Sequence, residues 1–197
     1  SNIYLMINNS IVADLEIKDE IKKDVVNTMQ ELKKMNINIH MFTGDTKEKA
    51  TEIAQQVGID NINYSMLPSD KYTYLEKIIK KKTEKSIVSF VGDGINDAPV
   101  LKLSDLGISM GSLGTDSAIE ASDVVIMNDN LEKIVTAINI SKKTNKIIKD
   151  NLIFALGVKL LVLVLTLIGL STMLEAVFAD VGVTVLCILN TLRLLKK

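Results

Sequence analysis

The first 150 residues alternate between short apolar runs and longer segments in which apolar residues recur every three or four positions. Short runs are typical of β-strands, and the longer spacing is typical of helices that cover one face of a sheet. The first two runs, Ile3 to Ile7 and Ile11 to Leu15, flank Asn8-Asn9-Ser10. Asparagine tolerates the positive φ of tight turns, so these runs predict a β-hairpin.

Strands and helices then alternate from residue 21 to about residue 140. The predicted strands cover residues 37–42, 62–64, 86–90, 106–110 and 124–127, and the predicted helices cover 21–35, 47–57, 68–82 and a short stretch within 111–121. Such alternation places helices on both faces of a parallel sheet. The pattern therefore predicts an α/β fold with a doubly wound, mostly parallel sheet.

The pattern changes after Asn151. A long amphipathic helix from Leu131 carries several lysines and then becomes apolar, and only six of the 47 charged residues lie beyond Asn151. The apolar stretches 151–170 and 174–195 each have the roughly 20 residues that a bilayer requires. We expect them to form a two-helix transmembrane hairpin.

Basic residues flank both apolar stretches at the same end of this hairpin. They are Lys142, Lys143, Lys146 and Lys149 before the first stretch, and Arg193, Lys196 and Lys197 at the end of the second. Because positive charges favour the cytoplasmic side, the sheet and the carboxyl terminus are expected in the cytoplasm, in a multi-pass protein of the cell membrane. The formal net charge is -1, which disfavours nucleic acid as a partner.

A nine-residue loop, Val91-Gly92-Asp93-Gly94-Ile95-Asn96-Asp97-Ala98-Pro99, follows one predicted strand. Its glycines let the backbone approach an anion, while Asp93 and Asp97 can face one cavity. Carboxylates beside a phosphate favour Mg²⁺. The alternative is an ordinary Asp-Gly turn.

Two further candidates accompany this loop. Thr43-Gly44-Asp45 follows the strand predicted over 37–42, at the sheet edge where α/β proteins bind ligands. Asp45 and Glu48 also match a capping box for the next helix, and the two roles are compatible. Lys71 lies in the first turn of a predicted helix, where a cation opposes the helix dipole, so we expect it to have another role.

Lys159 and Asp180 lie inside the two apolar stretches. Each would cost about 2.5 to 3.5 kcal/mol at the bilayer centre, so neither is expected to face lipid unpaired. Their depths differ by about 8 Å, which a lysine side chain can largely bridge. The pair is interpreted as part of a transport path, and a purely structural ion pair is the alternative.

These motifs carry a family resemblance. The nine-residue loop, with Thr43-Gly44-Asp45 and Gly114-Thr115-Asp116, resembles the phosphorylation domain of P-type ATPases, which has a haloacid-dehalogenase-like core. The segments Ala155 to Lys159 and Ala179 to Leu186 are similar to the last two helices of zinc-, cadmium- and lead-exporting members. The resemblance covers essentially the whole chain.

The resemblance implies a division of the chain. Residues 1–18 correspond to the end of a nucleotide-binding domain, 19–140 to a phosphorylation domain that lacks its nucleophile segment, and 141–197 to the last two transmembrane helices. It also implies ATP as substrate, an aspartyl-phosphate intermediate and a divalent metal, Zn²⁺, Cd²⁺ or Pb²⁺, as the transported ion.

The resemblance also implies roles for individual residues. Phosphate would be held by Thr43, Gly44, Lys71 and Asn96, with Asp45 and Asp97 also in the catalytic group, and Mg²⁺ by Asp93 with Asp97. In the membrane part, Asp180 would bind the transported metal and Lys159 would act as its counter-ion.

The family's nucleophile motif, Asp-Lys-Thr-Gly-Thr, does not occur in this sequence. We therefore expect the isolated chain to be inactive and to belong with a missing amino-terminal part of a pump, in a lipid bilayer. The alternatives are a membrane-anchored regulatory or partner subunit and a phosphatase of the dehalogenase type.

Overall fold

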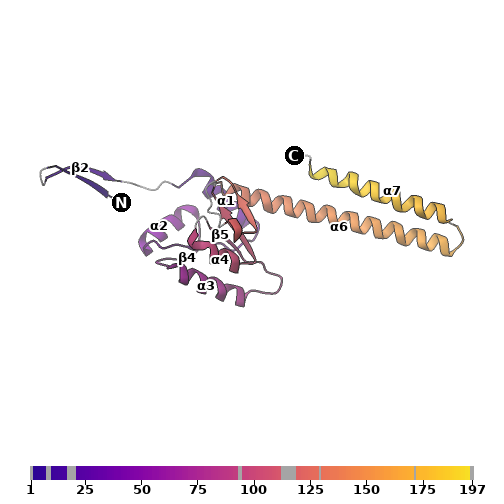
Figure 1. The fold of residues 1–197 in the computed structure, drawn as a ribbon, viewed down its shortest axis with the longest axis horizontal. Coiled ribbons are helices and arrows are strands. Elements are labelled where there is room, and N and C mark those ends of the chain that lie inside the picture. The colour runs from indigo at the N-terminus through magenta and orange to yellow at the C-terminus, as the bar shows by residue number, and fades with distance from the viewer. Residues whose placement is uncertain are drawn as a thin grey trace. The chain divides into compact units, whose positions relative to one another are not determined.

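The structure is a computed structural model of the 197-residue chain. It describes residues 2–7, 10–16, 21–92, 95–111, 119–128, 130–170 and 172–195. The chain divides into two compact units, Ser1–Lys133 and Ile134–Lys197. Strands and shorter helices make up the first unit, and long helices make up the second (Figure 1).

The first unit contains the predicted alternation of strands and helices. Its strands are β1 (Asn2–Ile7), β2 (Ser10–Glu16), β3 (His40–Phe42), β4 (Asn61–Asn63), β5 (Ser89–Gly92), β6 (Leu106–Met110) and β7 (Val124–Ile126). Its helices are α1 (Lys23–Lys34), α2 (Lys47–Val57), α3 (Pro68–Lys81), the 3₁₀ turn η1 (Ile95–Asp97) and α4 (Ala98–Leu103). The helix predicted within 111–121 lies mostly outside the described residues.

The strands pair as an α/β fold requires. β5, β6 and β7 form a parallel ladder in that order, and β3 pairs with β4 in parallel. β1 and β2 form the predicted antiparallel hairpin, with Tyr4 opposite Asp14. The parallel sheet with covering helices, followed by two long apolar helices, confirms the predicted fold class.

One strand is shorter than predicted. The stretch 37–42 was expected to be extended throughout, but β3 begins only at His40. The Ile37 N–H still donates to the Leu32 carbonyl at 3.2 Å, in the turn that ends α1. Asn36 adopts a positive φ of 59° in that turn, so the first predicted strand residues belong to the helix end.

The core of the first unit lies between helices and strands. Leu75 of α3, Phe90 of β5 and Leu101 of α4 are buried together. Gly107 of β6 brings α4 against the sheet, because a Cβ atom there would lie 2.8 Å from the Leu101 carbonyl oxygen. Any side chain at that position would have to displace α4.

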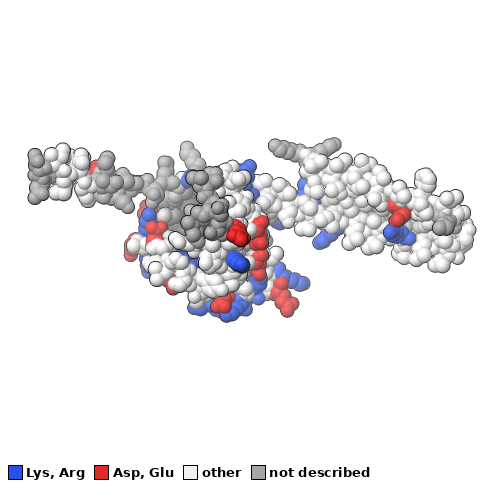
Figure 2. Space-filling model, viewed as in Figure 1, with Lys and Arg blue, Asp and Glu red and all other residues white. Residues whose placement is uncertain are grey.

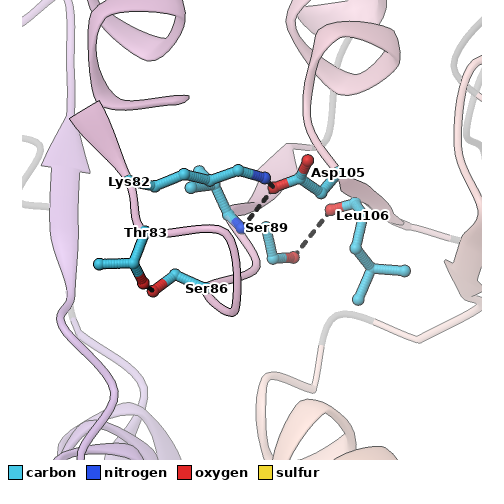
Figure 3. Close-up of polar contacts among 7 residues, drawn as sticks. Lys82, Thr83, Ser86, Ser89, Asp105 and Leu106 are labelled. Carbon is cyan, nitrogen blue, oxygen red and sulfur yellow. Dashed lines mark hydrogen bonds and ion pairs between the residues drawn. The ribbon is translucent and has the colours of Figure 1, made fainter. Parts of the chain in front are cut away.

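The connection from α3 to β5 is closed by a set of polar contacts (Figure 3). Ser86 lies in a turn in which its hydroxyl is 2.6 Å from that of Thr83, so β5 starts later than the predicted residue 86. Beyond the turn, the Ser89 hydroxyl donates to the Leu106 carbonyl at 2.8 Å. The start of β5 is thereby fixed to β6.

Asp105, just before β6, joins both ends of this connection. Its carboxylate pairs with the Lys82 ammonium and accepts a hydrogen bond from the Val88 N–H at 2.8 Å. Its own N–H donates to the Val88 carbonyl at 3.0 Å. The Lys82 ammonium, and next the Val88 N–H, hold the pKa of Asp105 below its ordinary value.

We expect Asp105→Asn to lower the free energy of unfolding at neutral pH by about 1 kcal/mol, since it removes a charge-assisted contact. A carboxylate with a lowered folded pKa stabilises the fold above its unfolded pKa of about 3.9. That stabilisation is lost as the pH falls through the lower folded pKa. Denaturation of both proteins followed by circular dichroism from pH 7 to pH 2 measures the difference.

The control is Asp60→Asn. Asp60 also pairs with a lysine, Lys33, at 2.7 Å, but its side chain is 81% exposed, and exposed pairs contribute little. The assigned role would be contradicted if the difference in free energy of unfolding between the wild type and Asp105→Asn stayed constant down to pH 2. It would also be contradicted if that difference were no larger than the one for Asp60→Asn.

The second unit is a helical hairpin. It is formed by α6 (Glu132–Leu167), which starts two residues before the unit boundary, α7 (Met173–Thr191) and the 3₁₀ turn η2 (Leu192–Leu194). The 36 residues of α6 correspond to about 54 Å of helix. Asn151 bonds to residues near the end of α7, and Lys159 pairs with Asp180 nearer its start, so the two helices are antiparallel.

Local sequence explains the turn of the hairpin. Gly169 takes a positive φ of 77°, and the Leu170 N–H donates to the Leu165 carbonyl at 2.9 Å, which is how glycine commonly ends a helix. The Glu175 carboxylate then accepts from the Thr172 N–H at 2.8 Å and caps α7. Glu175 therefore has a structural role.

Both helices are long and apolar enough to cross a membrane. Almost none of their apolar windows is buried within the chain, and most of this part of the molecule is white in Figure 2, with few charged groups. Apolar surface of this extent is stable only against lipid or other protein.

Candidate functional site

The candidate residues of the first unit follow strand ends that lie at one edge of each parallel pair. Thr43 comes directly after β3, which is parallel to β4, and the predicted loop begins at Gly92, the last residue of β5, which is parallel to β6. Ligands of open α/β sheets bind outside the carboxyl ends of the strands. The fold therefore places both segments where a ligand is expected.

Three aromatic rings bring the candidate segments together. The ring centroids of Phe42 and Phe90 are 6.3 Å apart, and those of Phe42 and Tyr74 are 5.4 Å apart in an edge-to-face contact. We call Phe42, Tyr74 and Phe90 the aromatic cluster. Phe42 precedes Thr43, and Tyr74 lies one helical turn after Lys71. The packing of these rings thus fixes the segments that carry the candidate side chains.

Thr43 is held from both its backbone and its side chain. Its N–H donates to the Asn63 carbonyl at 2.9 Å, and its carbonyl accepts from the Met66 N–H at 3.0 Å. The Thr43 hydroxyl donates to Asp45 Oδ2 at 2.9 Å and accepts from the Asp45 N–H at 3.1 Å. Asp45 therefore fixes the direction in which the Thr43 hydroxyl points.

The predicted capping box of α2 is wrong. The residue at the start of α2 is Thr46, and it makes no side-chain capping bond. The carboxylate of Asp45 is engaged by the Thr43 hydroxyl and lies 3.4 Å from Lys49 Nζ. Asp45 acts on the candidate site and on Lys49 instead of on the helix end.

Lys71 and Asp97 form a partly buried ion pair. Lys71 Nζ lies 2.9 Å from Asp97 Oδ1, and their side chains are 19% and 11% exposed. An ammonium group carries three donors, and among the described residues one of them is bonded to Asp97. Lys71 is therefore held in place by Asp97, with two donors that do not bond to described residues.

Gly92 packs closely against one member of this pair, Asp97. A Cβ atom at residue 92 would lie 3.0 Å from Asp97 Oδ2 and 3.1 Å from the Phe90 ring. Asp97 thus lies close to the end of β5, and a side chain at residue 92 would require Asp97 or the Phe90 ring to shift slightly. The glycine serves close packing, in addition to the backbone approach predicted from sequence.

The other predicted residues are less constrained. Asn96 lies in η1 and is exposed, and Gly44 is exposed with Met66 O as the nearest atom to an added Cβ, at 3.5 Å. Asp93 and the segment Gly114-Thr115-Asp116 lie outside the described residues. Their predicted roles remain expectations from the sequence.

The second unit contains the predicted pair of intramembrane charges. Lys159 Nζ lies 3.0 Å from Asp180 Oδ1, and both side chains are more than half exposed, at 65% and 58%. The pair therefore lies on the outer surface of the hairpin. Across the described residues, no three His, Cys, Asp or Glu side chains gather to hold a metal, so Asp180 would need ligands from elsewhere.

A polar network that was not predicted from the sequence joins α6 and α7. Asn151 Nδ2 donates to the Cys187 carbonyl and to the Thr191 hydroxyl, both at 3.2 Å, and Asn190 Nδ2 donates to Asn151 Oδ1 at 2.8 Å. Arg193 in turn donates to Asn190 Oδ1 at 3.1 Å. The signal available in the sequence was a polar residue near the same end of each apolar stretch, Asn151 in the first and Asn190 in the second.

The α/β sheet, its strand-edge site and the order of its elements agree with a known family. The family model of haloacid dehalogenase-like hydrolases matches residues 3–105, more than half of the chain. The chain belongs to the haloacid dehalogenase-like hydrolase family.

Comparison with individual proteins gives a more specific likeness. The chain is 44% identical to the zinc-transporting ATPase of Synechocystis sp. (strain ATCC 27184 / PCC 6803 / Kazusa), over 98% of this chain and 27% of the relative. It is 41% identical to the cadmium, zinc and cobalt-transporting ATPase of Bacillus subtilis (strain 168), over 98% of this chain and 28% of the relative. The chain thus spans about a quarter of these relatives' length.

A solved structure gives the same comparison in three dimensions. The crystal structure of a zinc-transporting PIB-type ATPase in the E2.Pi state superposes with a TM-score of 0.84 at 34% identity, covering 96% of this chain and 30% of that one. These matches confirm the resemblance to zinc- and cadmium-transporting P-type ATPases predicted from the motifs.

Proposed function

We propose that the chain forms the carboxyl-terminal part of an ATP-driven exporter of heavy-metal cations that works through an aspartyl-phosphate intermediate. One observation carries the proposal. The chain combines a strand-edge site, where Lys71 and Asp97 pair at 2.9 Å, with an apolar hairpin that exposes a second pair, Lys159 and Asp180, at 3.0 Å. A phosphoryl-transfer site and an ion path in one chain are the two parts that such a pump must couple.

In this proposal the strand-edge residues hold the phosphoryl group. The Thr43 hydroxyl, oriented by Asp45, and the Lys71 ammonium donate to its oxygens, and Gly44 and Asn96 complete the contacts. Phosphoryl transfer depends mainly on positioning and on neutralising charge. The Thr43 hydroxyl is held 2.9 Å from Asp45 Oδ2, and the Lys71 ammonium is held 2.9 Å from Asp97 Oδ1, so both groups are suited to that task.

Asp93 and Asp97 would hold Mg²⁺. Mg²⁺ prefers carboxylate oxygens beside phosphate, and Asp97 offers a side chain that is only 11% exposed and packs against the end of β5. The residue types therefore fit the ion. When bound, Mg²⁺ would neutralise negative charge on the phosphate oxygens.

The second unit would form the last two helices of a multi-pass membrane protein whose sheet domain is cytoplasmic. Residues 1–18 would end a nucleotide-binding domain, 19–140 would form the phosphorylation domain and 141–197 the membrane part. Asp180 would bind the transported Zn²⁺, Cd²⁺ or Pb²⁺, with Lys159 as counter-ion. The similarity to zinc- and cadmium-transporting ATPases supports this division.

The proposal predicts that the chain alone forms no phosphoenzyme, because Asp-Lys-Thr-Gly-Thr does not occur in its sequence. Joined to the preceding three quarters of the Synechocystis zinc-transporting ATPase, in place of that protein's own ending, it should restore the phosphoenzyme. Acid-stable ³²P incorporation from labelled ATP, with and without Zn²⁺, measures both results.

The matched control is the same chimera carrying Lys142→Gln, a surface change remote from both ion pairs in the sequence. Label on the isolated chain would favour the phosphatase alternative. A folded, membrane-inserted chimera without label would favour a separate partner subunit.

A further inference from the structure

The second unit contains a cavity of about 560 Å³ that the proposed function does not use. It is lined by Lys143, Lys146, Ile147 and Asp150 of α6 and by Arg193 of η2. Three cations and one carboxylate give this lining a positive balance. We call this cavity the basic pocket.

The spacing of the lining residues makes them one face of α6. Residues 143, 146, 147 and 150 are three and four apart, so they lie along one side of the helix. Ile147 is 6% exposed and forms a buried floor, and Lys146 and Arg193 are exposed. The pocket is therefore apolar at its base and positive at its rim.

The asparagine network links Arg193, which lines the pocket, to both helices. Asn151 joins α6 to α7 through Asn190, and Asn190 Oδ1 accepts from Arg193 at 3.1 Å. Arg193 still has further guanidinium donors. A cation fixed by its neighbours loses less conformational entropy when it binds an anion.

Exposed apolar side chains follow the pocket residues closely along α6. Ile148, Leu152 and Ile153 are 56%, 57% and 72% exposed. A ligand that fits both surfaces has an anionic head and an apolar body. Basic pockets between membrane helices at the cytoplasmic side bind such lipid headgroups.

We propose that the basic pocket binds the phosphate headgroup of an anionic phospholipid, whose acyl chains lie along the exposed apolar face of α6. This inference rests on the proposed membrane hairpin. A soluble phosphate would share the head chemistry but gain nothing from the apolar surface, so the lipid is the favoured source.

The chain has no tryptophan, so one introduced reporter can be observed alone. Leu195→Trp places it two residues after Arg193, and Leu170→Trp places it at the other end of the hairpin. Both leucines are exposed, at 80% and 72%. Each protein is reconstituted in phosphatidylcholine vesicles containing equal fractions of either brominated phosphatidylglycerol or brominated phosphatidylcholine, and quenching is compared.

At position 195 we expect the anionic lipid to associate about fivefold more strongly than the neutral one, the effect of about one well-placed cation near a membrane. At position 170 the two lipids should quench equally. In the Leu195→Trp protein, Lys146→Gln with Arg193→Gln should bring the ratio of anionic to neutral lipid association close to one.

The matched control is Lys142→Gln with Lys149→Gln, which removes the same charge from positions on α6 that do not line the pocket. If both double variants lost the preference for the anionic lipid equally, the preference would come from diffuse surface charge, and the proposed lipid site would be overturned. Loss of the preference on adding millimolar glycerol phosphate would identify a soluble phosphate ligand instead.

The remaining outcomes separate this inference from the proposed function. No quenching at either position would show that the hairpin does not enter the bilayer, and both proposals would fail. Equal quenching by both lipids at position 195 would overturn the lipid site alone. Native mass spectrometry of the chimera should show bound phosphatidylglycerol that the Lys146 and Arg193 changes remove, and its absence would mean that the rest of the pump covers the pocket.

Discussion

Replacing Asp180 with alanine is expected to lower metal-stimulated ATP hydrolysis about 100-fold in a complete pump, while the first unit stays folded. Mutation of a residue that only hydrogen-bonds to a metal ligand already costs about 10- to 100-fold in metal affinity or activity. Asp180 is the proposed ligand itself. Its side chain is 58% exposed on the hairpin surface, so the change removes no buried packing. Zinc-dependent phosphate release, with circular dichroism of the purified protein, tests the prediction.

Lys159→Ala is expected to act differently. It leaves Asp180 able to bind a divalent ion but removes the charge that lies 3.0 Å from the carboxylate when no metal is bound. Metal binding should then persist while release slows, so that turnover falls with little change in affinity. Equilibrium binding of Zn²⁺ and steady-state turnover separate the two effects.

Two controls distinguish a transport role from a structural one. Glu175→Gln removes another acid from α7 but keeps an acceptor for the Thr172 N–H, so it should leave activity unchanged. The neutral pair Lys159→Met with Asp180→Asn should be inactive if the pair serves transport. Full metal-stimulated turnover in that double variant would show that the charges are only structural.

Asp97→Asn should lower phosphoenzyme formation by about 100-fold or more, because it removes negative charge from the proposed Mg²⁺ site and weakens the hold on Lys71. Lys71→Met should be comparably severe, since it removes the ammonium proposed to contact the phosphoryl group. Phosphorylation of the chimera at several Mg²⁺ concentrations distinguishes them. Excess Mg²⁺ should partly restore Asp97→Asn and should not restore Lys71→Met.

The single changes also affect stability. Lys71→Met leaves the carboxylate of Asp97, whose side chain is 11% exposed, without its cation, and such a loss costs up to several kcal/mol. Lys71→Met with Asp97→Asn removes both charges and should recover much of the thermal stability. Recovery of phosphorylation together with stability would show that the pair only holds the fold.

Periodicity was sufficient to predict elements whose burial follows the pattern. The strand 106–110 was predicted with the bounds it has as β6, a short run whose three central residues are all buried in a parallel ladder. The strand expected at 37–42 was too long, because hydrophobic residues cannot reveal that Asn36 adopts a positive φ of 59°. Turn geometry at a helix end is set by single residues, so it cannot be predicted from the spacing of apolar residues along a segment.

The candidate site, too, could be predicted only in part from the sequence. The segments of Thr43, Lys71 and Asp97 were found because each lies at a recognisable strand or helix end. The contact between Lys71 and Asp97 at 2.9 Å joins residues 26 positions apart, and no local pattern encodes such a separation. The Asn151 network is likewise formed across 36 to 40 positions, so it emerged only from the packed helices.

The aromatic cluster has a consequence for protein engineering. Phe90 is buried and Phe42 is partly buried against the core, while Tyr74 is 38% exposed and packs its ring against Phe42. Phe42 is bonded directly to Thr43, and Tyr74 lies one helical turn from Lys71. Interiors are close-packed, so a change of ring size displaces neighbouring backbone. A library that randomises these three positions to gain thermostability would therefore also sample altered hydroxyl and ammonium placement, and its members must be screened for turnover as well as for melting temperature.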